Sequence, residues 1–257
     1  MTSPLLNYQV SDALAIITLN QPEKRNAISA AMWSGIPALI EKANKDQTVE
    51  IIVIEGADGH FAAGADISEF ESVYATTEKA TEYTVTMLKA LRVLERSAKP
   101  TIAKIRGACV GGGMSIALAC DFRYADNSAR LGITPSKLGL VYSADDTRRL
   151  VQTVGSGAAK RLLMTAEIIS ADAAEALGLV DIVVAADRLE SEISGFAQAI
   201  SGKSQWSVRA TKRMFQHLAP GEDKAAMALM LEAFDGPDFQ EGYKAFLAKR
   251  KPDFPFR

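Results

Sequence analysis

The sequence is poor in histidine and cysteine, and it has no long apolar run. His60 and His217 are its only histidines, and Cys109 and Cys120 its only cysteines, among 257 residues. Two histidines exclude a multi-histidine metal centre, and the cysteines lack metal-binding spacing. We therefore expect buried thiols in a reducing compartment, without a disulfide. No apolar stretch approaches the roughly 20 residues that cross a bilayer.

The chain also lacks an excess of either charge. The 29 basic and 31 acidic residues give a net charge of −2, which offers no general attraction for nucleic acid or an anionic membrane. Residues 1–4 have neither the charged and apolar regions of a secretory signal nor the arginines of a transit peptide. We therefore expect a cytoplasmic protein with no nucleic-acid partner and no membrane partner.

Short β-branched runs alternate with helical stretches over the first two-thirds of the chain. Strands are predicted at residues 14–19, 51–55 and 101–105, and further strands at 122–124 and 181–184. Apolar spacing predicts one helix that follows an N-cap at Ser29 and runs to about residue 45. It predicts a second over about residues 78–97, closed by Pro100. This alternation is typical of an α/β domain with βα crossovers.

Beyond about residue 189 the pattern becomes wholly helical. Helices are predicted at about residues 189–201, 205–217, 222–235 and 237–250. Such a short stretch buries its own apolar faces poorly. We therefore divide the chain into an α/β core of residues 1–195 and a helical region of residues 196–257, which we expect to pack on another surface or subunit.

Two glycine-centred turns are the most informative local feature. Residues 61–67 (FAAGADI) and 107–113 (GACVGGG) each follow a β-like run, and the second turn opens into an apolar helix at 114–120 (MSIALAC). Turns of this kind can point backbone N–H groups at one spot, next to the positive end of a helix dipole, and so stabilise an oxyanion. Neither turn matches a nucleotide motif, because Gly113 stands where a P-loop has lysine.

At these turns the chain resembles the crotonase family, the enoyl-CoA hydratase/isomerase superfamily. Residues 19–27 (LNQPEKRNA) are similar to its N-terminal signature, and residues 241–252 (EGYKAFLAKRKP) to its C-terminal helix. The resemblance implies an α/β fold, a crotonase-like spiral of ββα units with a helical C-terminal trimerisation region. It also implies an acyl-CoA substrate, a homotrimer or dimer of trimers, no metal, and no cofactor apart from the coenzyme A of the substrate.

The resemblance also implies a role for individual residues. The N–H groups of Ala65 and Gly112 would hold the thioester oxygen. Six residues would lie along the CoA moiety, namely Lys24, Arg25, Ala27, Ala63, Asp66 and Ile67. Phe246 and Lys249 would contact CoA from a neighbouring subunit. The basic cluster at residues 249–251 suits phosphates on physical grounds too, and a solvated helix end has the same pattern.

Two departures from the hydratases of this family bear on the reaction. Those enzymes carry one glutamate three residues after the oxyanion-hole glycine and a second about twenty residues later, where this chain has Ser115 and Pro135. Neither residue can act as a carboxylate base. Because a positioned acid or base contributes about 10²–10⁴ in rate, the loss of both should cripple the addition of water, whereas decarboxylation needs no base. Residues 134–143 resemble the methylmalonyl-CoA decarboxylase branch, including Tyr142. We therefore expect decarboxylation of a short malonyl-type CoA, with Tyr142 orienting the carboxylate and Ser115 as an auxiliary polar contact.

Two alternatives stay open. Asp145 or Asp146 could serve as the single base of an enoyl-CoA hydratase or double-bond isomerase, provided that burial raises its pKa. Capping of a helix at residues 147–154 is the simpler role for at least one of them. The other alternative is an acyl-CoA binding protein without turnover.

Overall fold

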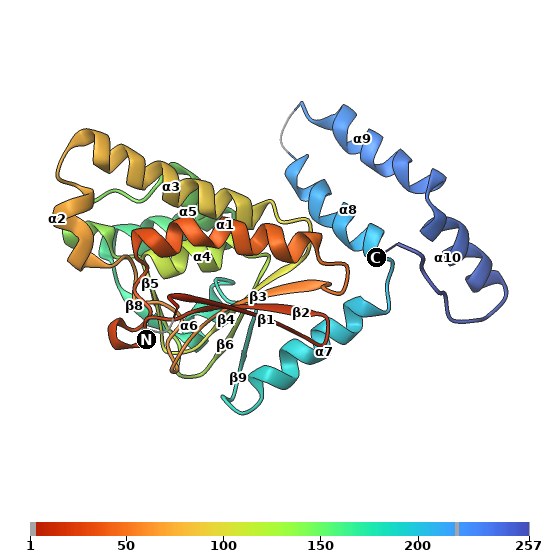
Figure 1. The fold of residues 1–257 in the computed structure, drawn as a ribbon, viewed down its shortest axis with the longest axis horizontal. Coiled ribbons are helices and arrows are strands. Elements are labelled where there is room, and N and C mark those ends of the chain that lie inside the picture. The colour runs from red at the N-terminus through yellow and green to blue at the C-terminus, as the bar shows by residue number, and fades with distance from the viewer. Residues whose placement is uncertain (1–3, 219–220, 257) are drawn as a thin grey trace.

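The protein has an α/β core and a helical arm at its C-terminal end (Figure 1). The computed structural model describes residues 4–218 and 221–256. The larger sheet has the strand order β1-β2-β3-β4-β6-β9 and the smaller sheet the order β5-β7-β8. The larger sheet contains β1 (Leu6–Ser11), β2 (Leu14–Leu19), β3 (Ile51–Gly56), β4 (Thr101–Ile105), β6 (Phe122–Asp126) and β9 (Ile182–Val184). The smaller contains β5 (Ala108–Val110), β7 (Arg130–Gly132) and β8 (Ile168–Ser170).

The five predicted strands are confirmed, and β2 and β4 have the predicted bounds. They pair in parallel throughout, as βα crossovers require. The strand β1 was not predicted, because it lacks a β-branched run. It pairs with β2 as an antiparallel hairpin. Asp12 and Ala13 form the turn with φ values of 49° and 63°, which matches the two positive φ values of a tight hairpin loop.

Successive units of the chain give one strand to each sheet. After β4 the chain enters β5 and then α4 (Gly112–Ala119), and after β6 it enters β7 and then α5 (Ala144–Thr165). The helix α4 is buried over almost its whole length, since residues 113–119 are all buried. The predicted α/β class with ββα units is therefore confirmed.

The two faces of the larger sheet are covered by different helices. One face carries α1 (Ala30–Lys45) and α3 (Thr77–Glu95), and the opposite face carries α7 (Leu189–Ser201), as Figure 1 shows. The predicted N-cap of α1 is confirmed, because the Ser29 side chain accepts a hydrogen bond from the Met32 N–H at 3.2 Å. The short helices α2 (Phe70–Val73) and α6 (Ala171–Ala176) complete the core.

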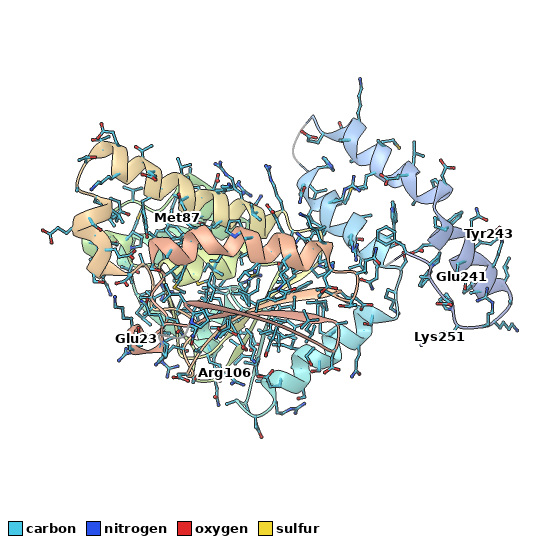
Figure 2. The ribbon with its side chains drawn as sticks, in the orientation of Figure 1. Glu23, Met87, Arg106, Glu241, Tyr243 and Lys251 are labelled. Atoms are coloured by element: carbon cyan, nitrogen blue, oxygen red, sulfur yellow. The ribbon has the colours of Figure 1, made fainter. Side chains whose placement is uncertain are left out.

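The helical arm begins after α7. The predicted boundary at residue 195 falls inside that helix, whose Leu189 and Ile193 pack in one apolar cluster with Ile51 and Val53 of the sheet. The arm consists of α8 (Gln205–Gln216), α9 (Asp223–Glu232) and α10 (Pro237–Leu247). Figure 2 shows its polar side chains, such as Glu241 and Lys251. Within the described ranges, no helix is long and apolar enough to cross a bilayer.

The arm exposes many large apolar side chains. Monomeric proteins rarely expose so many apolar side chains in one region. They are Phe215, Leu218, Met227, Met230, Leu231, Phe234, Phe239, Tyr243, Phe246 and Leu247. On the core side, Lys212 of α8 fixes the arm, because its Nζ lies 2.6 Å from Asp121 Oδ2 and donates to the Lys99 carbonyl at 3.0 Å. The prediction that this region cannot cover its own apolar faces is therefore confirmed.

We expect Gly113→Ala to lower the free energy of unfolding by about 1–3 kcal/mol. A Cβ at this position would lie 2.6 Å from the Ala62 carbonyl oxygen and 2.8 Å from the Ala62 Cβ. Urea denaturation measures the difference. The matched control is Gly157→Ala on α5, where a Cβ meets open space and alanine should stabilise the helix by about 0.5–1 kcal/mol. Equal losses in both variants would contradict the steric argument.

Candidate active site

The two predicted turns lie next to each other because short β-bridges join them. Ala62 forms a parallel bridge with Cys109 of β5, and its N–H donates to the Ala108 carbonyl at 2.8 Å. Ala65 forms a second parallel bridge with Ile28, which follows the N-terminal signature. Three segments that are far apart in the sequence therefore meet at one point.

The backbone N–H groups of Ala65 and Gly112 are neighbours. In the second bridge the Ile28 N–H donates to the Gly64 carbonyl at 2.7 Å, and the Asp66 N–H donates to the Ile28 carbonyl at 3.0 Å. The intervening N–H of Ala65 therefore turns to the other side. Gly112 is the first residue of α4, so its N–H has no acceptor inside the helix. A Cβ on Gly112 would lie 3.4 Å from the Ala65 nitrogen. Two adjacent donors at a helix N-terminus suit a developing oxyanion.

Two glycines give both turns their shape. Gly64 has a φ of 119° and Gly111 a φ of 51°, values that side-chain-bearing residues adopt at a cost. These backbone angles place the residues that follow, Ala65 and Gly112, in the positions described above.

A buried asparagine that the sequence analysis overlooked ties the N-terminal signature to the first turn. Asn26 has no exposed surface, and its Nδ2 donates to the carbonyls of Ala57 and His60 at 2.8 and 2.7 Å. His60 is half-buried, and its Nδ1 accepts from the Ala108 N–H at 3.1 Å. The ring thereby supports the start of β5.

The residues predicted along CoA form one rim with a buried anchor. Lys24, Arg25, Ala63 and Ile67 are exposed, whereas Ala27 and Asp66 are buried. Burial would raise the pKa of Asp66, but hydrogen bonds from Lys24, Ser68 and Gln21 lower it to about 2. The Asp66 carboxylate therefore holds the rim together. Phe246 lies on α10 of the arm and Lys249 just beyond it. Figure 2 shows Glu23, next to Lys24 of the rim, far from Lys251 at the end of the arm, so a single chain does not bring these two sets together.

Three of the predicted catalytic side chains form one hydrogen-bonded row beside the turns. Ser115 Oγ lies 2.9 Å from the Tyr142 hydroxyl and donates to Asp146 Oδ2 at 3.2 Å. A longer bond of 3.4 Å reaches the Gly111 carbonyl one turn back. Ser115 and Asp146 are buried and Tyr142 is half-buried, so the tyrosine is the most accessible member. The row begins one helical turn from the Gly112 N–H.

Asp146 is buried and faces a buried cation. Its Oδ2 accepts from Ser143 at 2.8 Å, and its Oδ1 lies 2.8 Å from Arg149. Burial raises the pKa of Asp146 in spite of these hydrogen bonds. Burial and the nearby Asp146 charge also raise the pKa of Tyr142 well above its usual value. The row therefore contains a carboxylate with increased proton affinity, as an acid–base group requires.

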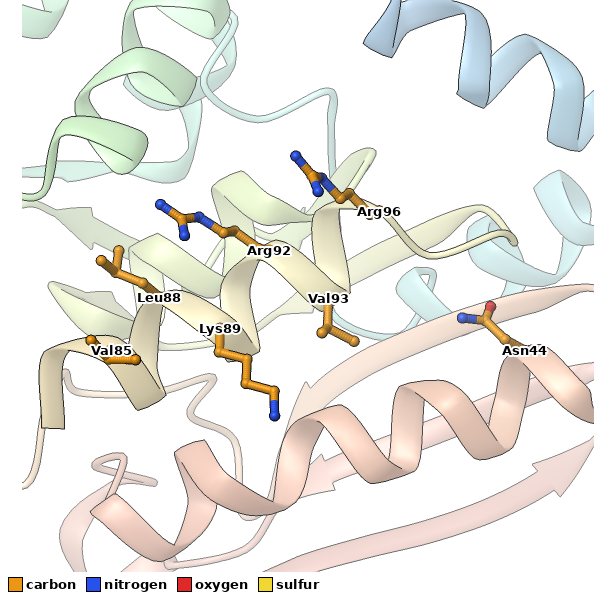
Figure 3. A pocket seen from close by; sticks show the side chains of 7 residues that line it. All are labelled: Asn44, Val85, Leu88, Lys89, Arg92, Val93 and Arg96. Carbon is orange, nitrogen blue, oxygen red and sulfur yellow. The ribbon is translucent and has the colours of Figure 1, made fainter. Parts of the chain in front are cut away.

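Asp145 points elsewhere. Its Oδ2 lies 2.8 Å from Arg92 Nε on the outer surface. Figure 3 shows Arg92 on α3, where five residues of that helix, its C-cap Arg96 and Asn44 of α1 line a groove of about 510 Å³. The expectation that an aspartate caps this helix is wrong. Ser143 is the N-cap of α5, and its side chain accepts from the Asp146 N–H at 3.0 Å.

Arg149 and Glu95 belong to the site, although the sequence analysis overlooked both. The Arg149 side chain is 3% exposed and lies 2.7 Å from Glu95 Oε2 on α3. Arg148 reaches the other oxygen of Glu95 at 2.8 Å. An arginine three residues after Asp146 is a signal that could have been read. Nothing in the sequence indicates that Glu95, 54 residues away, completes the network.

Comparison with known proteins now decides the family. The Enoyl-CoA hydratase/isomerase family model matches residues 9–256. The chain belongs to this family. Crotonyl-CoA hydratase of Syntrophomonas wolfei is 36% identical over 95% of both chains. Short-chain-enoyl-CoA hydratase of Clostridium acetobutylicum is 32% identical over 93% of this chain and 92% of that one. An enoyl-CoA hydratase/isomerase family structure from Hyphomonas neptunium superposes with a TM-score of 0.95, at 48% identity, over 99% and 98% of the two chains.

Membership of the enoyl-CoA hydratase/isomerase family confirms the resemblance stated above and supports an enzyme that acts on an acyl-CoA. It also confirms the crotonase fold with a C-terminal helical region. The closely matched relatives named above are hydratases. The methylmalonyl-CoA decarboxylase reading gains nothing from these comparisons.

We expect Asp66→Asn to lower the free energy of unfolding at pH 7 by about 2 kcal/mol, which corresponds to its pKa shift from 3.8 to about 2. Because the folded pKa is depressed, this stabilisation is complete above pH 3.8 and is lost as the pH falls through about 2. Urea denaturation at several pH values measures the difference. Asp58→Asn, on an exposed turn, is the control, and a constant difference down to pH 2 would contradict this linkage.

Proposed function

We propose that this chain moves a proton on an enoyl-CoA thioester and that Asp146 takes up and returns that proton. The N–H groups of Ala65 and Gly112 would hold the thioester oxygen, where each donor is worth roughly 3–4 kcal/mol as enolate charge develops. The observation that carries the proposal is the hydrogen-bonded row of Tyr142, Ser115 and Asp146 one helical turn from Gly112. The proposal includes no cofactor apart from the CoA of the substrate.

The donors in the row have a direction. Ser115 has one hydroxyl proton, which goes to Asp146 Oδ2. The 2.9 Å contact between Ser115 and Tyr142 is then made with the tyrosine proton. The Tyr142 oxygen keeps free lone pairs for a proton donor in the acyl pocket. When Tyr142 accepts a proton from the acyl pocket, its own proton moves to Ser115 and the Ser115 proton moves to Asp146. Asp146 is then neutral, and Tyr142 and Ser115 are protonated as before.

The relatives favour hydration of a 2-enoyl-CoA. Water would add its oxygen to C3, and one water proton would enter the row as Asp146 is protonated. The protonated Asp146 would then return a proton through the row to C2 of the enolate. Atoms and charges therefore balance with a single carboxylate. Crotonyl-CoA and short-chain enoyl-CoA are named in the relatives' activities, which supports a short acyl group.

Double-bond isomerisation is a second candidate, because the row holds one carboxylate where hydratases use two. A 3-enoyl-CoA would lose a proton from C2 to the row and regain one at C4. A single carboxylate, Asp146, is sufficient to carry the proton from C2 to C4, and no water is consumed. Both reactions pass through the same thioester enolate held by Ala65 and Gly112.

Decarboxylation of a malonyl-type CoA is less well supported by the geometry. Tyr142 was expected to orient the substrate carboxylate, yet it lies in one row with the Asp146 carboxylate. Arg149, the cation nearest to that row, already pairs with Asp146 and Glu95. A second negative charge beside Asp146 would be repelled.

We expect Asp146→Asn to lower turnover of crotonyl-CoA or of a 3-enoyl-CoA by about 10²–10⁴, the usual contribution of a positioned acid or base. Loss or gain of the conjugated thioester absorbance measures the rates. Asp145→Asn is the matched control, since Asp145 pairs with Arg92 at the surface, and its turnover should stay within about two-fold of the parent.

Three results would contradict this proposal. Equal turnover by Asp146→Asn and the parent would remove Asp146 from the chemistry. Release of CO₂ from methylmalonyl-CoA, abolished by Tyr142→Phe, would restore the decarboxylase reading. Tight binding of CoA thioesters without turnover of any of them would favour a binding protein.

We further propose that the chain acts as a homotrimer or a dimer of trimers, in which Phe246 and Lys249 contact the CoA of a neighbouring copy. Phe246 is 83% exposed on an arm rich in exposed apolar side chains. Lys249 has a φ of 52° just beyond α10, and Arg250 and Lys251 follow it. Such a cationic end suits phosphates.

We expect Lys249→Glu to raise KM for a CoA thioester about ten-fold or more and to leave kcat little changed, because a lost phosphate contact weakens ground state and transition state alike. Steady-state kinetics with crotonyl-CoA measures both. Lys244→Glu, on the same helix, is the control, and sedimentation of both variants checks assembly. A fall in kcat at constant KM would argue against a CoA contact.

A further inference from the structure

We propose that Glu95, on α3, is a positioning residue that controls through Arg149 how readily Asp146 takes up a proton. The inference rests on the proposed role of Asp146 in proton transfer. It concerns a residue that touches neither Ser115 nor Tyr142 in the described contacts.

The guanidinium of Arg149 is shared between two carboxylates from two helices. Its Nη1 lies 2.8 Å from Asp146 Oδ1 on α5, and its Nη2 lies 2.7 Å from Glu95 Oε2 on α3. The Arg149 side chain is 3% exposed, so water screens neither contact well. The buried guanidinium of Arg149 is therefore shared by two anions, of which Glu95 also pairs with the more exposed Arg148. Each anion weakens the hold of Arg149 on the other.

The effect on Asp146 follows from this sharing. Paired with Asp146 alone, Arg149 would favour the ionised carboxylate and lower its pKa. Glu95 adds a second negative charge to the same guanidinium and offsets part of that effect. Burial is the largest influence on Asp146, and its pKa stays raised although Ser143, Arg149 and Ser115 all donate to it.

The other groups around Asp146 do not replace Glu95 in this role. Ser115 on α4, Tyr142 in the preceding loop and Ser143 at the N-cap are neutral donors. Burial keeps the thiol of Cys109 on β5 neutral by raising its pKa. The remaining charges pair at the surface, Arg92 with Asp145 and Arg148 with Glu95.

In the described contacts, Glu95 pairs only with Arg148 and Arg149 and does not touch the row of Tyr142, Ser115 and Asp146. It lines, with Arg149, Gln152 and Thr153, a cavity of about 700 Å³ that is also lined by Lys212 and other residues of α8. The Glu95 side chain is 28% exposed. A substitution at Glu95 therefore changes the charge on the network without altering the row that faces the substrate.

The test is the pH dependence of kcat/KM for the turned-over enoyl-CoA in Glu95→Gln. Glutamine keeps the size and one acceptor oxygen but removes the charge, so Arg149 acts on Asp146 alone. We expect the acid limb, where activity is lost as Asp146 is protonated, to move to lower pH by about one unit. KM should change little. An acid limb that stays in place while the melting temperature changes would overturn the inference and leave Glu95 a purely structural role.

Arg148→Gln is the matched control, because it breaks an ion pair between α3 and α5 but keeps the Glu95 charge. Its acid limb should stay in place or move to higher pH, and a move to lower pH would overturn the inference. Should Glu95→Gln fail to fold, Glu95→Asp keeps the charge and should retain the parental limb, whereas a shifted limb would count against the inference.

A second measurement separates this inference from the proposed function. Titration of the ¹³C-labelled aspartate carboxyls by NMR, with Asp146→Asn used for assignment, follows Asp146 directly without turnover. A lower Asp146 midpoint in Glu95→Gln supports the inference even when Asp146→Asn retains activity, which would defeat only the proposed function. An unchanged midpoint overturns the inference alone.

Discussion

The close contact between the two glycine turns is the constraint on which the site depends. The first turn is joined to β5 through Ala62 and to the N-terminal signature through Ala65. Gly113 lets α4 begin against the Ala62 backbone, where even one methyl group would collide. Because both turns hydrogen-bond to neighbouring segments along their length, neither can move aside independently. The position of the two N–H donors is thus determined by backbone packing and needs no side chain.

Behind these donors the protein buries charge, which is costly unless every ion has a partner. The row from Tyr142 to Asp146 continues into Arg149, and Arg149 continues into Glu95. Replacement of such an ion pair by apolar residues is often neutral or stabilising, so stability alone does not account for it. The proposed proton transfer at Asp146 would give these buried ions a chemical use.

Much of the fold was predictable because its signals are local. The β-branched runs gave β2 and β4 with the correct bounds, and Ser29 marked the start of α1. The three-residue strands β5, β7 and β8 exist only through pairing with distant segments, so no local pattern indicates them.

The same distinction applies to the site. The glycine turns and the family motifs predicted Ala65 and Gly112 as backbone donors, and the structure places these two residues side by side. The choice between Asp145 and Asp146 could not be made from sequence, because adjacent helical residues point about 100° apart and only the packing of α5 decides which faces inward. Glu95 reaches Arg149 from another helix, and an ion pair between distant residues leaves no periodic trace.

The two thiols have a consequence for the chemical durability of this site. Cys109 lies within the second turn and its sulfur contacts that of Met114 on α4. Cys120 is the C-cap of the same helix. Both cysteines are buried and free. Burial raises the pKa of Cys120 to about 12, so the thiolate that reacts with peroxides and alkylating agents is scarce. Oxidative damage beside the two glycine turns therefore requires the core to open first. The sulfur atoms beside the site are protected by the same packing that holds the donors in place.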